Sequence, residues 1–230
     1  MRRGPKKGGV LTKPLAALEL EDLKEAAFKF LEHLSKTGIP ELYGVTDGKA
    51  VGTYVEAAFR AHLSQLFSFK PGNAALGSDF PSLGVDLKVT SVKQPQSSCP
   101  FSSASQKVYG LGYHLLVFVY EKADDVANKV ARLIFRHGLF IEKQRTADYQ
   151  TTRGLISILD RDGNKDDIVA FLEERNLPLD EIGREALAKE ILKKRPVLGV
   201  LTMSNALQWR LQYGRAITVA GVEAGVQKLL

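Results

Sequence analysis

Cysteine is nearly absent from this 230-residue sequence, which contains Cys99 alone. A single cysteine forms neither an intrachain disulfide nor a cysteine-based zinc cluster, so the disulfide-framed and zinc-finger classes are excluded. Long apolar runs are also missing: none approaches the length of a membrane span, and none of signal-peptide length follows the basic first residues. We therefore expect a protein that is neither secreted nor membrane-embedded and that works in a reducing, cytoplasmic setting.

Histidine is scarce too, and its four residues are scattered along the chain at His33, His62, His114 and His137. Because they do not cluster at ligand-like spacing, a histidine-based metal site is disfavoured. The acidic stretch 160–167 does not match a calcium loop, since its glycine stands at the fourth place and Phe171 at the twelfth. This stretch predicts a turn and a helix start instead.

The remaining composition is that of an ordinary globular protein, with 44% hydrophobic and 25% charged residues. The length suits one core domain with a small appended region. A formal net charge of +6 gives modest support for an anionic partner such as nucleic acid. Residues 1–14 are rich in Lys, Arg, Gly and Pro, which predicts a flexible basic arm: either a solvated tail or an arm that lies along DNA phosphates.

The periodicity of apolar residues predicts an α/β chain. Apolar positions recur every three or four residues over 19–34 and 51–66, which predicts two helices. Strands are expected at 85–90 and 114–122, and 130–141 is expected to form a strand or a bent pair. Helices follow at 165–174 and 180–194, then short strands and a closing helix from about Val222. We expect a central mixed β-sheet flanked by helices over 15–150, and a C-terminal α+β region over 151–230.

The segment 78–88, SDFPSLGVDLK, carries two carboxylates and a lysine at short spacing. On a strand, Asp86 and Lys88 project from the same face. Hydrolysis of a phosphodiester needs carboxylates that hold a cation and a positive charge near the phosphate, and Asp79, Asp86 and Lys88 supply these groups. By spacing alone an alternative is equally good, in which Asp79 caps a turn and the other two residues decorate an edge strand.

Together with its flanks, this segment resembles the active-site region of the MutH/Sau3AI-like endonucleases in the PD-(D/E)xK superfamily. In that family an Asp-Phe pair precedes a Leu-Gly-Val-acid-Leu-Lys strand, as from Asp79 to Lys88. The upstream segment 48–59, GKAVGTYVEAAF, is similar to the family's lysine, glycine and helical glutamate. The similarity spans about residues 48–90. It departs from the family in having Asp86 where MutH-like enzymes have glutamate, and in lacking a clear counterpart of a further lysine before the next strand.

The resemblance implies a restriction-endonuclease-like core that cleaves double-stranded DNA with Mg²⁺ and leaves 5′-phosphates. It implies that Asp79 and Asp86 bind the metal, that Glu56 is a further metal ligand or positions the water, and that Lys88 stabilises or activates the nucleophile. No MutH-like segment for target reading or partner docking follows Lys122, which favours a type II restriction endonuclease over a strand-nicking repair enzyme. A noncatalytic DNA-binding protein is the alternative from another class. A homodimer would suit the cutting of both strands at symmetric sites.

Residues that contact DNA are expected close to this segment. By the same resemblance, Lys49 is a candidate phosphate contact. The segment 92–107 is rich in Gln, Ser and Lys, and it is either a DNA-contacting loop or an ordinary polar loop. Residues 164–195 predict a recognition module or two scaffold helices. The candidates within 92–107 are Lys93, Gln94, Gln96, Ser102 and Lys107; near the C-terminus they are Arg210, Gln212, Arg215 and Trp209, the last of which is more often a packing residue.

Overall fold

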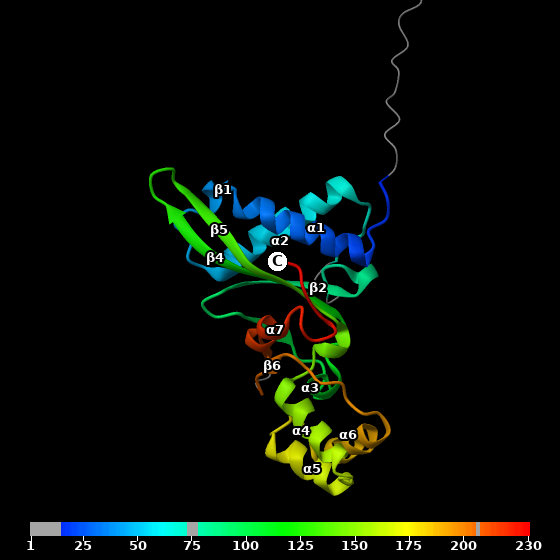
Figure 1. Ribbon diagram of the computed structural model, residues 1–230. Helices are drawn as coiled ribbons and strands as arrows, with labels where there is room; N and C mark the ends of the chain where they lie inside the picture. The colour runs from blue at the N-terminus through cyan, green and yellow to red at the C-terminus, as the bar shows by residue number, and fades with distance from the viewer. Residues whose placement is uncertain (1–14, 73–77, 206–207) are drawn as a thin grey trace, which may run out of the picture.

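The computed structural model describes residues 15–72, 78–205 and 208–230 (Figure 1). Its helices are α1 (Leu20–Ser35), α2 (Gly48–Leu66), α3 (Gln106–Tyr109), α4 (Tyr149–Asp160), α5 (Lys165–Glu174), α6 (Glu181–Lys193) and α7 (Gly214–Val219), with short 3-10 turns η1 (Pro40–Leu42), η2 (Pro81–Leu83) and η3 (Lys143–Arg145). Its strands are β1 (Gly38–Ile39), β2 (Val85–Ser91), β3 (Gln96–Pro100), β4 (His114–Asp125), β5 (Val130–Ile141), β6 (Thr202–Met203), β7 (Gln208–Gln212) and β8 (Val226–Lys228).

A mixed β-sheet forms the centre of the molecule, as the sequence predicts. Its strand order is β1-β5-β4-β2, and β8 pairs with a further stretch of β5. Strands β2 and β4 run parallel, whereas β4 and β5 form a long antiparallel hairpin. The segment 130–141 is one strand rather than a bent pair, and a bulge opposite Val119 and Tyr120 absorbs its irregularity.

Helices α1 and α2 cover one face of this sheet (Figure 1). Their apolar stripes are buried because the period of three and four residues puts these side chains on one side of each helix. Phe30 of α1 and Phe59 of α2 meet with ring centroids 5.0 Å apart, and Phe118 of β4 lies 5.3 Å from Phe59. Burial of these apolar groups fixes α2 against the edge of the sheet that β2 forms.

A second, three-stranded sheet of order β3-β7-β6 covers the opposite face, together with α7. Residues of its strands alternate, so that Cys99, Trp209 and Leu211 point inward and pack in one cluster with residues of β4 and β5. Pairing of β3 with β7 brings residues 96–100 beside residues 208–212, which are far apart in the chain. The segment 78–88 therefore lies at the margin of two packed sheets.

Helices α4 to α6 form a lobe with a hydrophobic cluster of its own, at the end of the molecule far from α1 (Figure 1). Helix α4 was not expected from the sequence. The closing helix expected from Val222 is wrong, because residues 221–225 form turns and lead into β8. Gly221 and Gly225 have φ angles of 77° and 78°, which interrupt a helix there. No helix in the described ranges is both long and apolar enough to cross a membrane.

Candidate active site

The loop that precedes β2 brings Asp79 next to the strand. Phe80 and Val85 pair through both backbone hydrogen bonds, with N···O distances of 2.9 and 3.2 Å, and this pairing closes the loop. Between them lie the 3-10 turn η2 and Gly84, whose φ of 60° favours glycine. Phe80 is buried against Phe59, so the loop is anchored in the core. The six residues between Asp79 and Asp86 therefore form a closed turn, which brings the two carboxylates close together.

Strand β2 presents two different faces. Val85 and Leu87 are buried beneath α2, whereas Asp86, Lys88 and Thr90 project from the other face. Within the described residues, β2 pairs with β4 only, so it is the edge strand of the central sheet. Both predictions from the alternation in this segment, a strand and a shared face for Asp86 and Lys88, are confirmed.

Asp86 and Lys88 form an ion pair, with Nζ 2.8 Å from Oδ2. Asp86 is only 7% exposed. Burial, together with a smaller effect of the neighbouring Asp79 carboxylate, raises the pKa of Asp86 to about 6 in spite of Lys88. Burial alone would lower the pKa of Lys88, but the charge and hydrogen bond of Asp86 outweigh burial and raise it. Lys88 therefore remains a cation at neutral pH.

Asp79 is held from two sides. Its Oδ2 accepts a hydrogen bond of 2.8 Å from the backbone N–H of Leu87, and its Oδ1 forms an ion pair with the guanidinium of Arg60. Arg60 is on α2, one turn after Glu56, and was not expected at the site. The sequence contained one usable signal, because a spacing of four residues places Arg60 and Glu56 on the same side of the helix.

Glu56 lies on α2 and is half-buried. Burial and the charge of Asp79 raise its pKa, while Arg60 and Lys88 act in the opposite direction. These influences show that Glu56 shares one electrostatic environment with Asp79 and Lys88. The structure thus brings the four residues predicted for catalysis, Glu56, Asp79, Asp86 and Lys88, to one place and adds Arg60 to them.

The donor set at this place suits Mg²⁺ better than a metal that requires a complete protein cage. Within the described residues, no three His, Cys, Asp or Glu side chains are arranged to hold a metal ion. Mg²⁺ prefers oxygen ligands and keeps several waters, so two carboxylates and a phosphate suffice. Asp79 and Asp86 are adjacent carboxylates, and the pKa of Asp86 is raised chiefly by its burial and in smaller part by Asp79. The residues present therefore fit a hydrated divalent cation.

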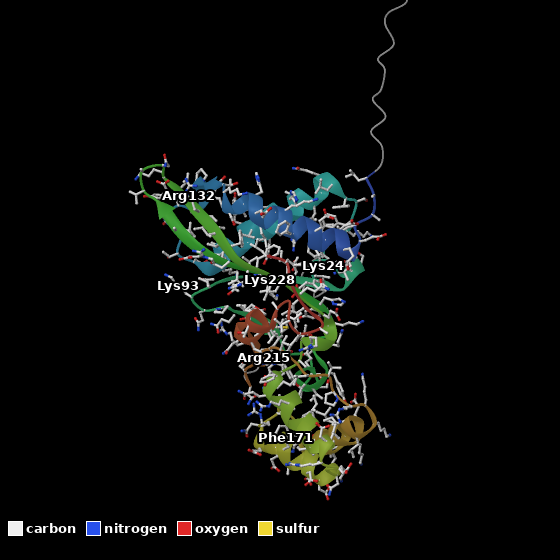
Figure 2. All side chains as sticks on the ribbon, viewed as in Figure 1. Lys24, Lys93, Arg132, Phe171, Arg215 and Lys228 are labelled. Atoms are coloured by element: carbon white, nitrogen blue, oxygen red, sulfur yellow. The ribbon has the colours of Figure 1, made fainter. Side chains whose placement is uncertain are left out.

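The candidate DNA contacts are spread over several elements, whereas the residues predicted for catalysis lie together. Lys49 is exposed in the first turn of α2, seven residues before Glu56 and thus on a similar side of the helix. Lys93 and Gln94 are exposed in the loop between β2 and β3, and Figure 2 shows Lys93 at the outside of the molecule there. Gln96 begins β3 and is half-buried, and Ser102 is exposed after β3.

The prediction that Lys107 contacts DNA requires a correction. The segment that contains it forms α3, and the residue is only 2% exposed. Its ammonium donates to the backbone oxygen of Met203 at 3.0 Å and to the side chain of Asn205, and burial lowers its pKa. Lys107 is therefore a buried link between α3 and the segment after β6, in a position unsuited to a DNA contact.

Comparison with known proteins indicates the activity to which this group of side chains belongs. The model of a family described as "Type II restriction enzyme NspV" matches residues 17–228. The chain belongs to the NspV family of type II restriction enzymes. A protein of Nostoc sp. (strain ATCC 29411 / PCC 7524), named Type II restriction enzyme NspV, is 54% identical over 212 residues, which are 92% of this chain and 96% of that protein. No solved structure matches.

The match to the NspV family model covers far more of the chain than the MutH-like segment does. The match includes the α4–α6 lobe and the second sheet, for which the sequence alone suggested no relative. The predicted type II restriction endonuclease is confirmed at the level of the family. A restriction-endonuclease-like core is likewise compatible with the central mixed sheet and its flanking helices.

Proposed function

We propose that this member of the NspV family is an endonuclease that cuts both strands of duplex DNA with Mg²⁺ held by Asp79 and Asp86. As a type II restriction enzyme it is a site-specific deoxyribonuclease. The observation that supports the chemistry is the ion pair between the buried Asp86 and the half-buried Lys88, beside Asp79 at the edge of the sheet. A pair of carboxylates next to a permanent cation is what binding of a metal and of a phosphodiester together requires.

The bound Mg²⁺ would supply a Lewis acid for the phosphate and lower the pKa of an attacking water. Lys88 remains protonated, so its role is to bind a phosphate oxygen and to stabilise the negative charge that grows in the transition state. This argues against Lys88 as the base that deprotonates the water. Glu56 has a pKa raised by burial and by the nearby charge of Asp79, so we assign it to orienting water.

Arg60 positions Asp79 before substrate arrives. Together with the N–H of Leu87, it fixes both oxygens of that carboxylate. A carboxylate held by two donors loses little further freedom when a cation binds, which favours a defined geometry at the phosphate. Arg60 also offsets the repulsion between Asp79 and Glu56.

Duplex DNA is the substrate, and the proposal includes a homodimer and a cytoplasmic location. A dimer with twofold symmetry would place one active site on each strand of a symmetric target. The free thiol of Cys99 is buried and requires no oxidising compartment. Sedimentation of the protein with and without duplex would show whether a dimer exists alone or forms on DNA.

One digest tests the cleavage proposal. A sequenced plasmid is incubated with the protein and Mg²⁺, in methylated and unmethylated form, and the ends are mapped on both strands. We expect double-strand cuts at one defined sequence with 5′-phosphate ends. Asp86→Asn is the matched variant, since it keeps the size of the side chain and removes its charge. Cuts in one strand only would indicate MutH-like nicking, and unchanged activity of Asp86→Asn would contradict the proposed metal site.

A further inference from the structure

The outer face of the β3-β7-β6 sheet consists of polar side chains in register. Arg210 and Gln212 project outward from β7, alternating with the inward Trp209 and Leu211. Pairing places Gln212 directly opposite Gln96 of β3 and opposite Thr202 of β6. In the same way Arg210 is opposite Ser98. The side chains on this face thus form cross-strand rows of hydrogen-bonding groups.

Carboxylates are missing from the segments that build this sheet. The chain has 26 Asp and Glu residues, yet neither 89–120 nor 191–222 contains one. These two segments supply β3, β6 and β7, and they are separate in the sequence. A polar face that merely contacts water usually mixes charges of both signs. A face built from two acid-free segments is instead suited to a polyanion.

Two side chains on this face are not engaged by other described residues and are therefore available to bind DNA. In the described part of the chain, the guanidinium of Arg210 and the amide of Gln212 have no hydrogen bond or ion pair. Arg215, five residues after Arg210, differs, because its guanidinium forms a hydrogen-bonded ion pair with Glu223 and stacks on the ring of Tyr149. Among the described residues, Arg210 therefore has no structural partner that would explain its presence.

A hollow of about 250 Å³ lies at one end of the face. It is lined by Gln94, Pro95, Gln96, Gln212 and Gly214, so three amide side chains converge on it. The hollow adjoins the catalytic strand, since the hydroxyl of Thr90 in β2 donates to the backbone oxygen of Gln96 at 2.9 Å and accepts from its N–H at 3.1 Å. A duplex cleaved at Asp86 and Lys88 would pass close to this end of the sheet.

We propose that the outer face of the β3-β7-β6 sheet reads base edges of the target duplex, with Arg210 reading a guanine and Gln212 an adenine. The inference rests on the proposed function and goes beyond it by locating specificity. A small antiparallel sheet fits the major groove, where arginine pairs with O6 and N7 of guanine and glutamine with N6 and N7 of adenine. Gln96 lies beside Gln212 and supports the same readout.

The test measures sequence preference separately from cleavage. The full-length protein, with Ca²⁺ in place of Mg²⁺, is used to select duplexes from a randomised pool, and the enriched sequence is determined. Variants are Arg210→Ala and Gln212→Ala; Arg132→Ala is the control, because Arg132 is another exposed strand arginine, on the outer part of the β4–β5 hairpin (Figure 2). Thermal unfolding followed by circular dichroism shows whether each variant is folded.

We expect the unaltered protein and the Arg132→Ala variant to enrich the same sequence. Arg210→Ala should lose preference at a guanine and Gln212→Ala at an adenine, by roughly 5- to 100-fold against the wrong base at that position. Three results would overturn the inference: an unchanged sequence preference, a uniform loss of affinity with a weaker salt dependence, as a phosphate contact gives, or no enrichment by the unaltered protein. Cleavage at a defined site together with any of these would leave the proposed function standing.

Discussion

The ammonium of Lys88 lies 2.8 Å from Oδ2 of Asp86, and both side chains project from the same face of the edge strand β2. This relationship places a cationic side chain in direct contact with the carboxylate that we propose as a metal ligand. Since Lys88 is the charged partner whose pKa is raised, its contribution is electrostatic.

Lys88→Ala should abolish most cleavage while DNA binding persists. Removing one group that stabilises charge in the transition state typically lowers the rate by about 10²- to 10³-fold. Single-turnover cleavage of a duplex that contains the mapped site measures the rate, and a gel shift in Ca²⁺ measures binding. Lys29→Ala serves as the control, since Lys29 pairs with Glu25 on the exposed side of α1. A Lys88→Ala enzyme with normal rate would refute the assigned role.

Binding of divalent metal should weaken as the pH falls through about 6. The pKa of Asp86 is raised to about 6, and only its ionised form binds a cation, so protons compete with metal below that value. Above pH 7 the affinity should level off with respect to this group. Isothermal titration calorimetry with Mg²⁺ or Ca²⁺ between pH 5 and pH 8 provides the measurement. Affinity independent of pH over this window would exclude Asp86 as a ligand.

Arg60→Ala should reduce cleavage by roughly tenfold, because Asp79 loses one of its two holding contacts. Arg60→Lys should recover part of the rate, since it keeps the charge but not the planar fork. The rate is measured against Mg²⁺ concentration, and we expect that excess Mg²⁺ does not restore it. Faster cleavage by Arg60→Ala at low Mg²⁺ would instead show that Arg60 competes with the metal for Asp79.

Phe80→Ala should destabilise the protein by about 3–5 kcal/mol, the usual cost of removing a buried aromatic side chain. Phe80 is buried against Phe59 and Phe69, and it also closes the loop that carries Asp79. Urea denaturation measures the loss of stability. Cleavage at a temperature where the variant is still folded should fall as well, whereas a loss of stability with full activity would show that the loop is positioned by other contacts.

The parts of the site that depend on local pattern could be predicted from the sequence. The alternation around Asp86 and Lys88 gave the strand and its polar face, and the MutH-like flanks added Glu56. For Arg60 the local pattern offers only its place on the Glu56 side of α2; its contact with Asp79 could not be predicted, because that contact exists only after residues 80–85 have closed their turn.

Long-range contacts explain the position of Lys107 and the formation of the second sheet, neither of which the sequence predicted. Lys107 appeared to lie in a polar loop, but its partners are Met203 and Asn205, almost a hundred residues away. The expected closing helix failed for a local reason, since Gly221 and Gly225 adopt left-handed conformations. The fold class was accessible from periodicity, whereas the second sheet depends on pairing between β3 and β7 that no local pattern specifies.

The hydroxyl of Thr90 has a consequence for how fidelity would be expressed. It joins the strand that carries Asp86 and Lys88 to the first residue of β3 through two hydrogen bonds with the Gln96 backbone. If the sheet reads bases as proposed, a displacement of β3 by a wrong base would be transmitted through the Thr90 side chain to the strand that carries Asp86 and Lys88. A duplex with a wrong base should then still bind but be cleaved slowly. The cleavage rate would thus discriminate between DNA sequences a second time, after binding.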